Sequence, residues 1–131
     1  MQIDIPDVLA EVRLAFERYE KALVTNDVKT LCELFADDPR TIRYGIAENL
    51  HGYADISAFR AARSSQNLMR VLSRTSITTY GRDFATASTL FRRDSAPGKI
   101  GRQMQTWVRQ PLGWRVVAAH VSLIDDPEAQ L

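Results

Sequence analysis

The second half of the chain contains four segments with β-strand character, separated by clear turn signals. The segments are residues 68–80, 84–93, 100–109 and 114–124. The turns between them contain Gly81, Pro97-Gly98 and Pro111-Leu112-Gly113, and glycine and proline in such positions mark short connections between strands. Long strands joined by short turns pair with their neighbours as an antiparallel meander. This half of the chain is therefore expected to form one curved sheet.

The first half of the chain is expected to supply three helices and one short strand. Apolar residues recur at helical spacing over residues 6–26, which predicts a long amphipathic helix. Shorter helices are expected over residues 28–35 and 54–63, with a strand over 41–46 between them. Helices that precede an antiparallel meander predict an α+β fold, with the helices on one face of the sheet.

Length and charge limit the classes of protein that this chain can belong to. The 131 residues carry a net charge of +1 with mixed signs, so we expect one domain over 1–131, with residues 125–131 as a loose tail. No nucleic-acid or membrane surface is indicated. The chain has one cysteine, Cys32, and no apolar leader, which favours a cytoplasmic setting.

The basic residues are unevenly chosen. The chain has fourteen arginines and three lysines. Arginine presents a planar fork that matches a carboxylate in two-point contact, so the bias fits a small anionic substrate. A high-GC genome produces the same bias, and composition alone does not separate these two explanations.

Sequence motifs of known chemistry are absent, and no metal or other cofactor is expected. The chain has no glycine-rich phosphate loop and no nucleophile elbow. His51 and His120 are its only histidines, and they have no carboxylate at ligand spacing. The residues that remain as candidates for a site are polar side chains on predicted inward faces: Tyr19, Arg43, Glu48, Asn49, Arg60, Gln105 and His120.

Each candidate also has a structural explanation, which is weakest for Arg43. This arginine lies inside an otherwise apolar strand, where an inward guanidinium is unfavourable unless it is paired. Tyr19 lies on the apolar stripe of the first helix, so its hydroxyl is expected to point inward and to need a partner. His120 shares a face with Trp114 and Val116 if the last strand alternates strictly; on spacing alone, a half-buried structural histidine is favoured there.

The order of elements, closed by Gly113-Trp-Arg-Val-Val-Ala-Ala-His-Val-Ser122, resembles the NTF2-like (cystatin-like, SnoaL-like) superfold. Such domains are cones, in which a curved antiparallel sheet wraps a long N-terminal helix and two shorter helices. More narrowly, the chain resembles the AtzH-like family. The segments that carry this resemblance are residues 16–19, 38–45, 48–52, 56–63, 101–109 and 113–123.

The resemblance implies a metal-independent amidohydrolase that acts, with loss of carbon dioxide, on a small dicarboxylated urea in cyanuric-acid or ureide breakdown. It implies that Tyr19 and Arg43 are the catalytic residues, with Arg60 as a candidate for a second carboxylate. We expect Tyr19, Arg43 and His120 to point into one cavity between the first helix and the inner face of the sheet, and Arg60 to reach the rim of that cavity. Glu48, Asn49, Gln105 and His120 would complete the substrate site. Carbon dioxide and ammonia are the expected products. A functional link to a partner amidase and a homodimer joined through its sheets are also implied.

Apolar residues on the outward strand faces point to the same dimer. We expect Leu90 there, together with Trp107 or Val108 and with Val121 or Leu123.

Two other functions stay open at this point. The chain is either an enzyme of this kind or a non-catalytic ureide-binding or accessory protein for a partner amidohydrolase. A third possibility, a proton shuttle of the ketosteroid-isomerase kind, ranks last. It needs a carboxylate base in an apolar cavity, and Asp37 and Asp38 lie in a turn.

Overall fold

Helices and strands follow one another largely as the sequence predicts. The structure is a computed structural model and describes residues 1–130. Its elements are α1 (Pro6–Val24), α2 (Val28–Glu33), β1 (Ile42–Tyr44), β2 (Asn49–His51), α3 (Tyr53–Ala62), β3 (Val71–Tyr80), β4 (Phe84–Arg92), β5 (Lys99–Gln110), β6 (Gly113–Asp125) and a short 3₁₀ helix, η1 (Pro127–Gln130). Among the described residues, no helix is long and apolar enough to cross a membrane.

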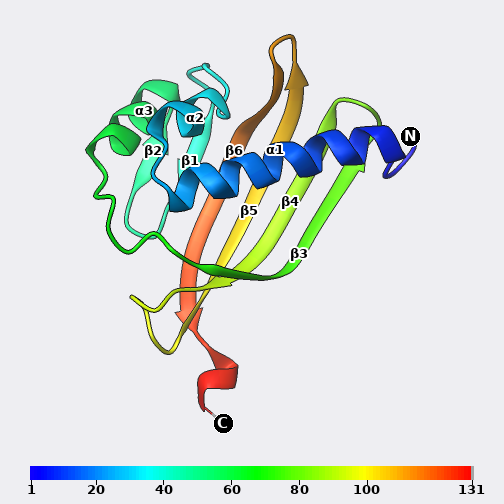
Figure 1. Ribbon diagram of the computed structural model, residues 1–131. Coiled ribbons are helices and arrows are strands. Elements are labelled where there is room, and N and C mark those ends of the chain that lie inside the picture. Colours follow the sequence, from blue (N-terminus) through cyan, green and yellow to red (C-terminus); the bar gives the residue numbers. More distant parts are fainter. Residues whose placement is uncertain (131) are drawn as a thin grey trace.

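The six strands form one sheet in the order β2-β1-β6-β5-β4-β3. Strands β3 to β6 are the predicted antiparallel meander. β1 joins β6 in parallel, and β2 pairs with β1 in antiparallel fashion. Helix α1 lies across one face of the curved sheet, and α2 and α3 lie beside β1 and β2 at one end (Figure 1). The α+β cone is thereby confirmed.

Strand β2 was not predicted. Glu48 and Asn49 were interpreted as candidates for the site or as turn formers, whereas Asn49 begins β2 and lies opposite Tyr44 of β1. The strand has only three residues, too few to show an alternating pattern in the sequence.

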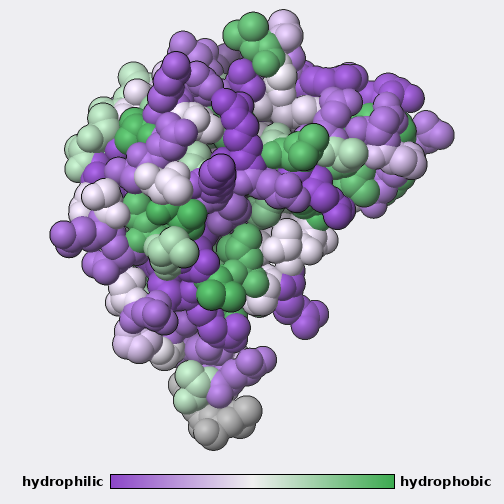
Figure 2. Space-filling model, in the orientation of Figure 1, coloured by the Kyte–Doolittle hydropathy of each residue, from purple (hydrophilic) through white to green (hydrophobic). Residues whose placement is uncertain are grey.

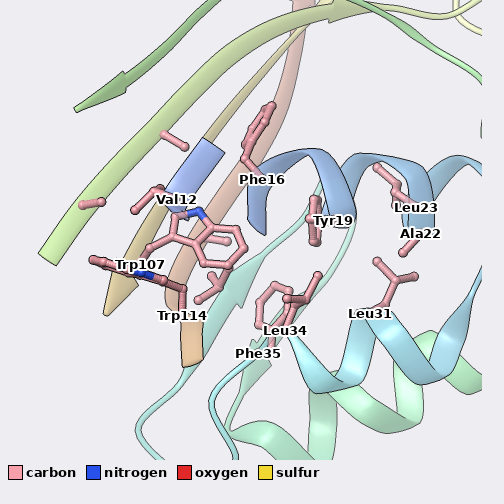
Figure 3. Close-up of a cluster of buried hydrophobic side chains, with 14 of the residues drawn as sticks. Val12, Phe16, Tyr19, Ala22, Leu23, Leu31, Leu34, Phe35, Trp107 and Trp114 are labelled. Atoms are coloured by element: carbon pink, nitrogen blue, oxygen red, sulfur yellow. The ribbon is translucent and has the colours of Figure 1, made fainter. Parts of the chain in front are cut away.

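The hydrophobic core lies between α1 and the sheet. Val12 and Phe16 of α1 are buried near Trp107 of β5 and Trp114 of β6 (Figure 3). Polar ends of the two indoles have partners: Trp107 Nε1 donates to Gln105 at 3.1 Å, and Trp114 Nε1 donates to a glutamate of α1, Glu11, at 3.1 Å. On the face that carries α1, hydrophobic residues form small separate groups among hydrophilic ones (Figure 2).

A β-bulge in β6 reverses the alternation that the sequence predicts. Thr106 lies opposite Ala118 and Trp107 lies opposite Val116, so Val117 is an extra residue without a partner on β5. A bulge of one residue turns all following side chains to the other face.

The burial of β6 follows this reversal. Trp114 and Val116 are buried before the bulge, and Ala119 and Val121 are buried after it. His120 is exposed, so the prediction that it points into the interior is wrong. Of the residues considered for the outward face, Trp107 and Val121 are also in the core.

The segment after β6 is attached to β4 through an ion pair. Buried Asp126 accepts hydrogen bonds from Arg92 Nε at 2.6 Å and from Arg92 Nη2 at 3.2 Å. These contacts and η1 lie in the stretch that was expected to be a loose tail. Leu131, the last residue of that stretch, lies outside the described residues.

Candidate functional site

A cavity of about 130 Å³ lies between the second half of α1 and the inner face of the sheet. This volume is well below the roughly 300–1,000 Å³ of pockets for drug-sized ligands, so the cavity suits a small molecule. Residues from α1, α3, β4, β5, β6 and the β1–β2 hairpin line it: Tyr19, Leu23, Arg43, Ile46, Ala47, Glu48, Phe59, Arg63, Arg70, Phe91, Arg93, Gln103 and Val121.

Tyr19 and Arg60 form a buried pair at this cavity. Arg60 Nη2 donates a hydrogen bond of 2.9 Å to the Tyr19 hydroxyl, which answers the expectation that this hydroxyl needs a partner. The Arg60 guanidinium also packs over the rings of Tyr19 and Phe35, at 5.8 and 5.7 Å from their centroids. Arg60 is fully buried and lies behind Tyr19, so the prediction that it reaches the rim of the cavity is wrong.

The charges around Tyr19 change its acidity. Burial raises the pKa of the Tyr19 phenol, while the positive charge of Arg60 lowers it. Arg43 and Arg70 lower it further, and the pKa ends below its ordinary value of 10.0. A phenol with a lowered pKa gives up its proton more readily, which is a property of groups that act in acid–base catalysis.

Arg43 points inward from β1, as predicted, and it is paired. Its Nη1 donates a hydrogen bond of 2.7 Å to Glu48 Oε1, and its guanidinium lies 5.3 Å from the Phe59 ring centroid. Gly45 makes room for this ion pair, because a Cβ at residue 45 would lie 1.7 Å from Glu48 Oε1. Glu48 keeps 22% of its side chain exposed, so the β1–β2 turn borders the opening of the cavity.

Arg70 occupies the opposite side of the cavity, and the sequence did not single it out. Its guanidinium binds both carboxylate oxygens of Glu20 and donates to Gln103 Oε1 at 2.9 Å. It also lies 4.5 Å from the centroid of Phe91. The Phe91 ring lies across Gly101, where an added Cβ would be only 2.1 Å from the ring.

Two further arginines, Arg63 and Arg93, line the cavity without an acidic partner within 4 Å among the residues that the structure describes. Burial and the nearby charge of Arg60 lower the pKa of Arg63 to about 10. Burial and the nearby charge of Arg70 lower the pKa of Arg93. Burial and neighbouring positive charges thus disfavour the charged form of both guanidinium groups.

The predicted site residues divide into three groups. Tyr19, Arg43 and Glu48 line the cavity. Gln105 is buried beside Trp107, away from the cavity lining, and Arg60 lies behind Tyr19. Asn49 and His120 are exposed, and the His120 ring packs edge-on against Tyr44 at 6.5 Å. No group of three or more His, Cys, Asp or Glu side chains within residues 1–130 is placed to hold a metal ion.

The polar and aromatic cavity residues that the sequence did not single out include Arg63, Arg70, Phe91, Arg93 and Gln103. They come from four separate parts of the chain. The one signal that points to them is the excess of arginine over lysine, which does not say which arginines meet.

Comparison with known proteins places this architecture in a family. The AtzH-like family model matches residues 1–127. The search of curated proteins found no match.

Solved structures with the same fold include two close relatives. A protein of unknown function from Pectobacterium atrosepticum is 59% identical, with a TM-score of 0.91 over 94% of this chain and 95% of that chain. A cystatin-like fold protein from Burkholderia xenovorans is 50% identical, with a TM-score of 0.92 over 97% and 99%.

A more distant structure shows the fold alone. An NTF2-like protein of unknown function from Pseudomonas putida is 20% identical, with a TM-score of 0.76 over 95% of this chain and 92% of that chain. Together with the family model and the two close relatives, the shared architecture establishes that this chain is a member of the AtzH-like family, with the NTF2-like, cystatin-like fold.

Proposed function

We propose that this protein is a decarboxylating amidohydrolase that acts on a small dianionic carboxylated urea such as 1,3-dicarboxyurea. The observation that carries the proposal is the Tyr19 hydroxyl, held at 2.9 Å by buried Arg60, at a small cavity whose walls carry four guanidinium groups. Family membership agrees with this chemistry. The cavity supports a small anion as the substrate, because buried guanidiniums favour carboxylates in two-point contact.

In the proposed step, Tyr19 Oη donates its proton to the ligand nitrogen next to one terminal carboxylate. The bond between this nitrogen and the carboxylate carbon breaks, its electron pair stays on the nitrogen, and carbon dioxide leaves. The phenolate then takes a proton from water. Arg60 stabilises the phenolate between these two proton transfers, and the lowered pKa of Tyr19 supports its role as the proton donor.

Arg43 is proposed to hold the ligand and not to transfer a proton. Glu48 fixes the orientation of the Arg43 guanidinium from the β1–β2 turn. A guanidinium held in this way binds a carboxylate with little loss of side-chain freedom. The ligand is thereby oriented toward Tyr19 before the reaction, which is a large part of what a small buried site contributes to rate.

The decisive assay incubates purified, chelator-treated protein with 1,3-dicarboxyurea, allophanate or oxalurate and measures carbon dioxide and ammonia separately. Carbon dioxide without ammonia indicates cleavage at a terminal carboxylate, as in the step above. Release of both indicates that the central amide is also cleaved. Measurable binding of all three without turnover of any would contradict the enzyme proposal and support a ureide-binding or accessory role for a partner amidohydrolase.

Substitution of Tyr19 tests the proton transfer. Tyr19→Phe keeps the ring and removes the hydroxyl, so we expect kcat to fall roughly 10²-fold or more. The free energy of unfolding should fall by about 1–3 kcal/mol, because Arg60 loses its acceptor. Tyr80→Phe, on β3 away from the cavity, serves as the control and should leave both quantities unchanged. A Tyr19→Phe protein with wild-type kcat would rule out the phenol as proton donor.

Substitution of Arg43 tests ligand binding. Arg43→Lys keeps the charge and loses the planar fork, so KM should rise by about tenfold or more. Arg13→Lys, on the exposed side of α1, should leave KM unchanged. Equal KM values for the two variants would show that Arg43 serves only its ion pair with Glu48.

We also propose that two copies associate through the outer face of the sheet. Met104, Phe84 and Ile124 on this face keep 60%, 42% and 40% of their surface exposed, and exposed apolar groups on a sheet favour association. Light scattering at micromolar concentration should give the mass of a dimer. The mass of a monomer would contradict this proposal without affecting the proposed reaction.

A further inference from the structure

The charges around the cavity do not balance. Five guanidinium groups surround it, from Arg43, Arg60, Arg63, Arg70 and Arg93. Within residues 1–130, only two carboxylates pair with these arginines, and they belong to Glu48 and Glu20. Three positive charges therefore lack a counter-charge from the protein. An anion with two negative charges can neutralise two of them, and the third can stabilise the Tyr19 phenolate after the proton has been donated.

The two sides of the cavity have the same design. On the side of β1 and α3, Arg43 is fixed by Glu48, and Arg63 has no acidic partner. On the side of β4, Arg70 is fixed by Glu20. Arg93, which also has no acidic partner within the described residues, packs on the Phe91 ring at 5.6 Å from its centroid. Each side thus combines one arginine held by a glutamate with one that is free to bind a ligand.

Arg63 and Arg93, like Arg43 and Arg60, also carry buried nitrogen atoms without a hydrogen-bond partner within residues 1–130. Among the described side chains, Arg63 Nη1 and Arg93 Nε are buried and make no hydrogen bond. Gln103 Nε2 on β5, at the same cavity, is also buried and unpartnered. Most buried polar groups in proteins have a partner, so donors left open on the wall of a cavity indicate where the polar atoms of a ligand bind.

We propose that Arg63 and Arg93 bind the two carboxylates of one dianionic ligand, one at each end, and so select ligands with two separated negative charges. This inference rests on the proposed function, whose substrate has a carboxylate at each end. It adds the two residues that would recognise those ends, and it predicts that a ligand with one carboxylate binds more weakly. Arg43 would then bind the same carboxylate as Arg63, and Arg70 the same carboxylate as Arg93, with Tyr19 between the two ends.

A matched pair of ligands tests the proposal without any reaction. Glutarate separates its two carboxylates by three atoms, as 1,3-dicarboxyurea does, but has no carbon–nitrogen bond to cleave. Glutaramate has the same length, with an amide in place of one carboxylate. By calorimetric titration, the wild-type protein should bind glutarate at least about tenfold more tightly than glutaramate, because one charged contact is lost. Equal affinities, or inorganic phosphate binding as tightly as glutarate, would overturn the proposal.

Substitutions of Arg63 and Arg93 test whether each arginine binds one carboxylate of the ligand. Arg63→Gln and Arg93→Gln should each lower the preference for glutarate to near equality, whereas Arg13→Gln on the exposed side of α1 should keep it. A preference that persists in either cavity variant would exclude that arginine. Arg63→Lys and Arg93→Lys provide a second pair if a glutamine variant does not fold; they keep the charge and should keep part of the preference.

The outcomes for the two proposals are separable. Glutarate binding that depends on Arg63 and Arg93, together with no turnover of dicarboxyurea, contradicts the amidohydrolase and leaves the two-ended anion site in place. Turnover that is unchanged in Arg63→Gln and Arg93→Gln supports the amidohydrolase and overturns the two-ended site.

Discussion

The two halves of α1 contact opposite kinds of surroundings. The first half places Val12 and Phe16 against the indoles of β5 and β6 (Figure 3). The second half places Tyr19 against Arg60 and Glu20 against Arg70. The apolar stripe runs along both halves without interruption, so the helical pattern alone does not reveal where the core ends and the site begins.

The two regions differ in how many of their buried polar atoms lack a hydrogen-bond partner. Among the described side chains, nine buried nitrogen and oxygen atoms lack a hydrogen-bond partner, and six of them belong to the arginines and Gln103 around the cavity. The two tryptophans of the core have their nitrogens paired. Since proteins pair most buried polar groups, the charged region is arranged for a ligand and the apolar region for stability.

The largest expected effect contrasts two fully buried residues, one from each region. Trp107→Ala should lower the free energy of unfolding by about 3–5 kcal/mol, because it removes a large ring from the core and leaves a void. Arg60→Met should change it much less, because an apolar side chain of similar size replaces an incompletely paired buried charge. Urea denaturation measures both, with the exposed Leu14→Ala as control. A similar loss in both variants would remove the distinction between the regions.

A smaller effect concerns the acidity of Tyr19. In Arg60→Met, less positive charge opposes the effect of burial on the Tyr19 phenol, so the pKa of Tyr19 should rise. Tyrosinate absorbance during a pH titration measures it, and the signal is assigned by its absence in Tyr19→Phe.

The sign of the stability effect follows from this lowered pKa. A folded phenol that ionises below its ordinary value of 10.0 adds stability above that value, and this contribution disappears as the pH falls through the folded pKa. The wild type should therefore gain stability over Arg60→Met as the pH rises across this interval. A difference that is constant with pH would show that Arg60 acts on Tyr19 through packing only.

The smallest expected effect is a gain in the free energy of unfolding, whereas most substitutions lower it. Arg63→Gln removes a guanidinium whose pKa is lowered to about 10 by burial and by Arg60. In carboxylate-free buffer at low salt, this variant should be more stable than the wild type by a few tenths of a kcal/mol, since solvent screens part of the repulsion. The gain should shrink at high salt and be absent in Arg13→Gln. A loss of stability would mean that Arg63 has a structural role.

Much of the fold follows from local patterns, whereas much of the site does not. The stripe of α1 and the turns of the meander identify their elements directly, and an inward arginine in a short strand marked Arg43. The cluster of Arg63, Arg70 and Arg93 depends on how α3, β4 and the segment before β3 meet in space. No local pattern contains that information, because Arg63 and Arg70 lie in an irregular segment and Arg93 is distant from both in sequence.

The placement of His120 failed for a different reason. Strict alternation along β6 assigned it to the inside, but the unpaired Val117 lies between Val116 and Ala118. Bulges depend on the register of the neighbouring strand, so one strand read by itself does not show them.

The bulge at Val117 also bears on how such a domain can change in length. Because Val117 is the residue without a partner on β5, its loss would leave Val116 opposite Trp107 and Ala118 opposite Thr106. Strict alternation would return, and Ala119 and Val121 would keep their inward direction. A lineage of these domains can therefore lose one codon here without changing which side chains of β6 face the cavity. An alignment gap misplaced by one position would assign the wrong face of the strand to the ligand.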